Sequence, residues 1–234
     1  MNNSIRPETL QLSNADSEFD VTLFRAKDAT ECILFASGLG GNPLRHLEFL
    51  QGIARQGISV IAPHFELLSS PFPVKAELLE RVQRLDVTAA EFCTNYRSLT
   101  GVGHSLGTVI LLMQAGAIAS TRAREEVAFN GKKIPDRLVL LAPPADFFRA
   151  PRSLNSVRIP VEIWVGAMDK VTPPSQAIFL NELLKEHAGG GVHIIEDAGH
   201  FTFMNTLPPQ VIDPHPSRNE FLQWLAGKVS QFIA

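Results

Sequence analysis

Apolar and polar positions follow two different periods along this chain, and each period predicts a different element. Short continuous apolar runs, such as Glu31 to Ser37, are typical of strands buried on both faces. Longer stretches with apolar residues three and four positions apart, such as Leu44 to Gln56, predict helices. The predicted strands are Leu10 to Leu12, Phe19 to Phe24, Glu31 to Ser37, Ile58 to Ala62, Ser98 to Gly103, Arg137 to Ala142, Val161 to Gly166 and Val192 to Glu196. The predicted helices are Leu44 to Gln56, Val74 to Tyr96, Leu106 to Ala119, Ser175 to His187 and Arg218 to Ile233.

The order of these elements indicates the fold class. Strands that alternate with helices of ten or more residues imply right-handed crossovers and a mostly parallel sheet with helices on both faces. The polar stretch SNADSE between the first two strands is typical of a hairpin, so we expect that pair to be antiparallel. Thr121 to Asp136 is polar and predicts a surface connection. We expect residues 1–234 to form a single α/β domain.

Composition excludes several classes of protein. The chain has 234 residues, is 45% hydrophobic and carries a net charge of −3, which argues against disorder and against a nucleic-acid partner. Two cysteines, Cys32 and Cys93, are too few for a disulfide scaffold or a cysteine-based zinc site, and we expect buried free thiols. No apolar run is long enough to span a bilayer, and the N-terminus has no apolar signal region. We therefore expect a cytoplasmic location.

The segment Gly103-His104-Ser105-Leu106-Gly107 has the pattern G-x-S-x-G at the junction of a predicted strand and a predicted helix. A sharp strand-to-helix turn at such a motif lifts the serine hydroxyl out of the sheet, and glycine at the flanking positions leaves room for that turn. The following helix also directs free N–H groups and a partial positive charge toward an oxyanion. Ser105 is therefore the candidate nucleophile.

A serine hydroxyl needs a base, and His200 is the best of seven histidines. It follows the last predicted strand in Glu196-Asp197-Ala198-Gly199-His200, where a short loop can place an imidazole over the sheet edge that carries Ser105. His104 is next to Ser105 in sequence, but a neighbour inside the turn points away from the serine, which favours a structural role. His64 and His215 lie in predicted loops and are weaker candidates for contact with substrate.

The histidine in turn needs a carboxylate that selects its tautomer. Asp169 follows the predicted strand Val161 to Gly166 and is the leading candidate, whereas Asp146, after the strand that ends at Ala142, is the alternative.

The order Ser105, Asp169, His200 resembles that of the α/β-hydrolase superfamily. The resemblance rests on the Gly103–Gly107 motif, on Val161 to Asp169 and on Asp197-Ala198-Gly199-His200-Phe201, and it extends from about residue 31 to the end. It implies an eight-stranded, mostly parallel sheet with an antiparallel strand near the start. In its compact size and its segment Arg84-Leu85-Asp86, the chain also resembles, more loosely, the dienelactone-hydrolase-like and platelet-activating-factor-acetylhydrolase-like members.

The resemblance also implies an oxyanion hole made of two backbone amides. One belongs to Leu106, the residue after the nucleophile, and the other comes from the loop Ser37-Gly38-Leu39-Gly40-Gly41, where position favours Leu39. Many members have His-Gly where this chain has Ser37-Gly38, so the identity of the second donor is open.

Members of the superfamily usually insert a cap between the strands that here end at Ala142 and begin at Val161. The intervening Pro143 to Pro160 has room for one short helix, so we expect no large cap domain and an open or shallow site. The residues expected to line an acyl pocket are Phe147, Phe148, Phe201 and Met204, although packing of the loops onto the sheet would explain them equally well.

These residues predict a serine hydrolase that cleaves a small-molecule carboxylic ester, or a thioester or amide, without metal or cofactor. Acyl transfer, or cofactor-free haloperoxidase-like activity, on the same three residues is an alternative. A non-catalytic ligand-binding protein that keeps the fold is another. Neither the acyl length of the substrate nor the oligomeric state follows from the sequence.

Overall fold

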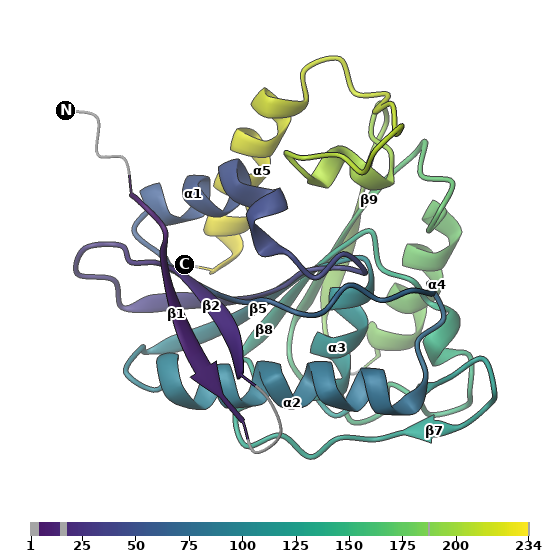
Figure 1. The fold of residues 1–234 in the computed structure, drawn as a ribbon. Coiled ribbons are helices and arrows are strands. Elements are labelled where there is room, and N and C mark those ends of the chain that lie inside the picture. The colour runs from purple at the N-terminus through teal and green to yellow at the C-terminus, as the bar shows by residue number, and fades with distance from the viewer. Residues whose placement is uncertain (1–4, 15–17, 187, 234) are drawn as a thin grey trace.

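The computed structural model describes residues 5–14, 18–186 and 188–233. Eight strands of this part of the chain form one sheet in the order β1-β2-β4-β3-β5-β8-β9-β10 (Figure 1). Only β2 runs against its neighbours β1 and β4, and the remaining pairs are parallel, which confirms the predicted sheet. The strands are β1 (Glu8–Ser13), β2 (Glu18–Phe24), β3 (Glu31–Ala36), β4 (Ser59–Pro63), β5 (Ser98–His104), β8 (Arg137–Leu141), β9 (Val161–Gly166) and β10 (Gly190–Ile195).

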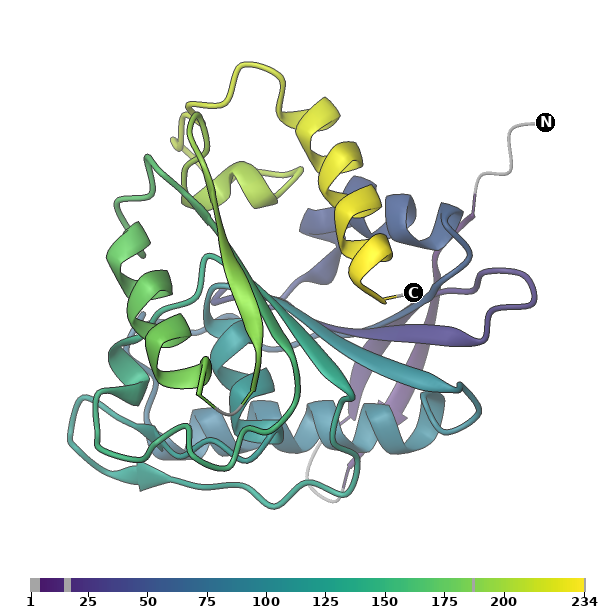
Figure 2. The same ribbon diagram turned by 180° about the vertical axis from the view of Figure 1, so that it is seen from behind.

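Helices cover both faces of the sheet (Figures 1 and 2). On one face, α1 (Leu47–Arg55) packs against α5 (Arg218–Ile233), and on the other lie α2 (Lys75–Phe92), α3 (Leu106–Gln114) and α4 (Pro174–Leu184). Each layer buries its own apolar cluster, because side chains alternate between the two faces of every strand. The described residues also form three short 3₁₀ turns: η1 (Pro43–His46), η2 (Asp146–Phe148) and η3 (His200–Phe203).

The helix predicted for Leu106 to Ala119 ends earlier, at Gln114, and this changes the chain after it. Gly116 has φ 99°, and the amides of Gly116 and Ala117 bond to the carbonyls of Met113 and Leu112, which is a Schellman termination. The chain after Gly116 forms a two-stranded antiparallel ribbon of β6 (Ala119–Ser120) and β7 (Glu126–Val127). The sequence predicted the end of a helix and a polar connection there.

Other boundaries differ by a few residues. The helix predicted to reach Tyr96 ends at Phe92, and the one predicted to reach His187 ends at Leu184. His187 itself, and residues 15–17 of the predicted hairpin loop, lie outside the described residues.

The connection from β8 to β9 contains η2 and turns but no cap, as the sequence predicted. No domain inserted between β8 and β9 therefore covers the carboxyl end of β5. Within the described ranges, no helix combines the length and the apolar character that crossing a bilayer requires.

Candidate active site

Ser105 occupies a strained turn between β5 and α3. Its φ of 53° and ψ of −124° lie in a region that residues with a Cβ rarely adopt. The amide of Ser105 donates to the carbonyl of Leu141 at 2.9 Å, which ties the turn to the end of β8. A Cβ on Gly107 would lie 1.9 Å from the carbonyl oxygen of Ala36, so the α3 backbone packs directly on β3. The glycines of the motif are therefore required by close approach of the backbone.

The structure brings Ser105, His200 and Asp169 together at the carboxyl end of the sheet. His200 Nε2 lies 3.0 Å from Ser105 Oγ, and His200 Nδ1 lies 2.9 Å from Asp169 Oδ2. His200 comes from η3, which follows β10, and Asp169 lies in the turn after β9. Parallel strands deliver their carboxyl ends to one edge, which is why three residues far apart in sequence converge.

Asp169 is fully buried and is held by more than the histidine. Its Oδ1 accepts the amides of Val171 and Thr172 at 2.8 and 2.7 Å, and its Oδ2 lies 2.9 Å from the hydroxyl of Thr172. That hydroxyl also lies 3.0 Å from His200 Nδ1. Sequence reasoning missed Thr172, although a threonine three residues after an aspartate that can form an Asx turn is the signal that could have identified it.

Two buried histidines support the backbone of η3. His104 Nε2 donates to the carbonyl of His200 at 2.9 Å, and His46 Nδ1 donates to the carbonyl of Phe203 at 2.8 Å. Burial lowers the pKa of His46 to about 4 and holds the pKa of His104 well below its usual range. Both rings are therefore neutral at pH 7, and His104 positions the main chain of His200 instead of contacting Ser105 Oγ.

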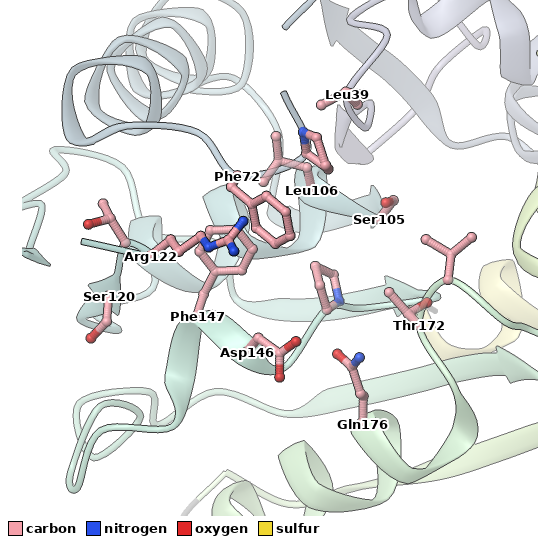
Figure 3. Close-up of a pocket in the computed structure, with 14 residues that line it drawn as sticks. Leu39, Phe72, Ser105, Leu106, Ser120, Arg122, Asp146, Phe147, Thr172 and Gln176 are labelled. Carbon is pink, nitrogen blue, oxygen red and sulfur yellow. The ribbon is translucent and has the colours of Figure 1, made fainter. Parts of the chain in front are cut away.

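A cavity of about 620 Å³ opens beside Ser105 (Figure 3). Ser105 and Thr172 lie toward one end, and Phe72 and Arg122 lie toward the other, with the Arg122 guanidinium 4.7 Å from the centre of the Phe72 ring. The cavity is lined by Leu39, Pro71, Phe72, Ser105, Leu106, Ser120, Thr121, Arg122, Pro144, Asp146, Phe147, Val171, Thr172 and Gln176.

Comparison with known proteins gives a likeness in structure alone. No protein-family model matches the sequence, and no curated protein matches it. The structure of Thermogutta terrifontis esterase 2 phosphoramylated by tabun superposes with a TM-score of 0.67 at 14% identity, covering 97% of this chain and 95% of that one. A carboxylesterase from Lactobacillus plantarum superposes with a TM-score of 0.65 at 14% identity, covering 97% of both chains. An esterase from Pyrococcus furiosus superposes with a TM-score of 0.68 at 12% identity, covering 98% of this chain and 90% of that one.

The chain has the α/β-hydrolase fold. In this fold Ser105 stands at the turn after β5, next to the loop that follows β3. Gly38 in that loop is so close that a Cβ there would lie 3.2 Å from Ser105 Cβ. The amides of Leu39 and Leu106 make no hydrogen bond within the described parts of the chain, and both residues line the cavity. Their role as oxyanion donors remains a prediction.

Of the four residues expected to line an acyl pocket, the structure places only Phe147 on the cavity beside Ser105. Phe148 is fully buried in the core, because successive residues of a 3₁₀ turn point in different directions. Phe201 lines a different cavity of about 270 Å³ together with His200, and Met204 is buried and lines neither cavity. Spacing along a loop could not show which face each side chain takes.

The weaker candidates contact residues outside the three-residue cluster. His64 Nε2 lies 2.8 Å from the hydroxyl of Thr22, and the His215 ring packs 5.0 Å from that of Phe221. Asp146 lines the cavity but pairs with Arg149 at 3.1 Å and not with a histidine.

Sequence reasoning also missed the residues of the far end of the cavity. Ser120, Thr121 and Arg122 reach it through the β6–β7 ribbon, which the sequence did not predict. Phe72 lies between two prolines in the loop after β4, and this placement beyond a strand's carboxyl end was a usable signal. No group of three or more His, Cys, Asp or Glu side chains among the residues that the structure describes is arranged to bind a metal ion.

Proposed function

We propose that this protein is a serine hydrolase that cleaves carboxylic esters through an acyl-enzyme on Ser105. The observation that supports this most directly is the continuous hydrogen-bonded series Asp169, His200, Ser105 at the wall of a cavity. An ordinary serine hydroxyl is a weak nucleophile, and this arrangement supplies the base and the carboxylate that activate it.

The hydrogen bonds favour the histidine tautomer that the reaction needs. Asp169 Oδ2 accepts a hydrogen bond from His200 Nδ1–H. The ring hydrogen is therefore on Nδ1, and Nε2 directs its lone pair toward Ser105 Oγ. The buried carboxylate also stabilises the imidazolium that forms when His200 takes the serine proton.

In the proposed reaction Ser105 Oγ attacks the ester carbonyl while its proton passes to His200 Nε2. The carbonyl oxygen becomes an oxyanion, which the amides of Leu39 and Leu106 bind. The carbon–oxygen bond to the alcohol then breaks, and His200 returns the proton to the departing alkoxide. A water molecule activated by His200 hydrolyses the acyl-enzyme, releases the carboxylic acid and restores Ser105.

The cavity favours an ester with one apolar group. Phe72, Leu106 and Phe147 line it with apolar side chains, and no cap inserted between β8 and β9 covers it. We propose that the acyl chain occupies this 620 Å³ space and that the alcohol leaves on the solvent side.

A covalent probe tests the proposal directly. One superposing structure is of an esterase phosphoramylated by tabun, so we expect an organophosphorus reagent to react here as well. A fluorophosphonate should add to Ser105, as peptide mass spectrometry would show, and p-nitrophenyl esters of graded acyl length should be hydrolysed. Ser105→Ala should abolish both. Turnover that survives this substitution, or a wild-type protein inert to both reagents, would reject the proposal.

A further inference from the structure

Arg81 is a buried cation for which the proposed reaction gives no role so far. It lies on α2, is 1% exposed, and has no carboxylate within ion-pair distance in the described parts of the chain. Burial lowers its pKa to about 10, so it is still charged at pH 7. Burying an arginine with no carboxylate in direct contact costs several kcal/mol, which its hydrogen bonds and the nearby charges of Glu66, Glu77 and Glu80 offset. Its partners therefore indicate what it does.

Those partners are three main-chain carbonyls from two loops at the site. Arg81 Nη1 donates to the carbonyl of Gly38 at 2.9 Å, and Nη2 donates to the carbonyls of Leu39 at 3.1 Å and Glu66. The guanidinium also lies 5.0 Å from the centre of the Phe65 ring. One side chain thus binds the loop after β3 to the loop after β4.

Because the peptide group is planar, these hydrogen bonds also fix the direction of the Leu39 N–H. The peptide between Gly38 and Leu39 is trans, so its C=O and N–H point in opposite directions. Because Arg81 holds that C=O on its own side, the Leu39 N–H faces away from the guanidinium. The next carbonyl, that of Leu39, is likewise held by Arg81 and by the amide of Leu68 at 3.2 Å.

The loop lies against Ser105, because a Cβ on Gly38 would lie 3.2 Å from Ser105 Cβ. The loop is a tight turn in which the Gly41 amide donates to the Gly38 carbonyl at 3.1 Å, and Leu39 lines the cavity with Ser105. A hydrogen bond from a cation to one end of a peptide also polarises its N–H and strengthens it as a donor.

We propose that Arg81 is a positioning residue for the oxyanion hole, holding the Gly38–Leu39 peptide so that the Leu39 amide faces the oxygen that becomes negative. The inference rests on the proposed function of Ser105 and adds the element that orients its second oxyanion donor.

Arg84 provides a matched control. It lies one turn further along α2, is 3% exposed, and donates to the carbonyl of His64, outside the oxyanion loop. We compare Arg81→Met, Arg81→Lys and Arg84→Met by kcat and KM on p-nitrophenyl butyrate and by thermal melting. Losing one oxyanion donor lowers kcat about 10²–10³-fold, and a misdirected donor should lower it about 10- to 100-fold. We expect that loss in Arg81→Met with KM nearly unchanged, partial recovery in Arg81→Lys, and near wild-type kcat in Arg84→Met.

Inhibitor binding separates positioning from general loss of structure. A trifluoromethyl ketone adds to Ser105 and places a negative oxygen in the hole, whereas the matching methyl ketone does not. Arg81→Met should weaken the first by the same factor as kcat/KM and leave the second unchanged. In Arg81→Ala, millimolar guanidinium should restore part of kcat, with no gain in wild type.

The outcomes distinguish the two proposals. Equal losses in Arg81→Met and Arg84→Met, unchanged kcat in Arg81→Met, or equal weakening of both ketones would overturn the role of Arg81 while leaving the hydrolase intact. A wild-type protein that neither turns over esters nor binds the trifluoromethyl ketone would remove the proposed function, and the role of Arg81 with it.

Discussion

Replacing Asp169 by asparagine tests the histidine tautomer, because the structure decides how the new amide must lie. Oδ1 of Asp169 accepts two backbone amides, from Val171 and Thr172, and an NH₂ group cannot accept either bond. The asparagine oxygen therefore takes the Oδ1 position, and its NH₂ takes the place of Oδ2, 2.9 Å from His200 Nδ1. That NH₂ donates to Nδ1, so the hydrogen of the imidazole moves to Nε2.

The reversed tautomer has no free lone pair toward Ser105, so the serine keeps its proton. In a serine protease the same change lowers kcat about 10⁴-fold, equivalent to about 5.5 kcal/mol of activation free energy. We expect a loss of about 10³- to 10⁴-fold in Asp169→Asn.

Asp146→Asn is the control, since Asp146 also lines the cavity. Its side chain is 68% exposed and pairs with Arg149, so we expect a change of less than about threefold. The assay is kcat for p-nitrophenyl butyrate at pH 8, with thermal melting to confirm that each variant is folded. A folded Asp169→Asn protein that keeps kcat within about tenfold, or an equal loss in Asp146→Asn, would refute the reasoning.

Two further predictions concern the surroundings of the site. The pKa of His46 falls from 6.5 in the unfolded chain to about 4 in the folded protein, so below pH 6.5 the unfolded state binds more protons and stability is lost as the pH falls. Between pH 7 and pH 5 this removes about 2 kcal/mol from the free energy of unfolding. In urea titrations the free energy of unfolding should depend less steeply on pH in His46→Asn than in wild type. Equal pH dependence in the two proteins would contradict the prediction. Phe148→Ala should lose about 3–5 kcal/mol of stability with little change in acyl preference, whereas Phe147→Ala should shift that preference toward longer esters with a smaller loss of stability. The reverse pattern in melting and ester-panel assays would show that the two rings have been assigned to the wrong faces.

Local sequence was sufficient for the fold because each element carries its own signal. The buried parallel strands, such as β3 and β8, have continuous apolar centres, and the helices between them keep a period near 3.6. The errors fell where a single residue outweighs such a pattern. Gly116 ends α3 inside an apolar run, and its left-handed backbone releases the segment that forms β6.

The sequence by itself determined that the sheet is mostly parallel and that Ser105, Asp169 and His200 each follow the end of a strand. Reactive residues at strand ends can be recognised from the local pattern alone. Only the tertiary structure decided which side chains meet there. Thr172 on Asp169, Arg81 on the Gly38–Leu39 peptide and the split between Phe147 and Phe148 depend on directions in space. Those directions are set by packing between segments distant in sequence, and no periodicity within one segment records them.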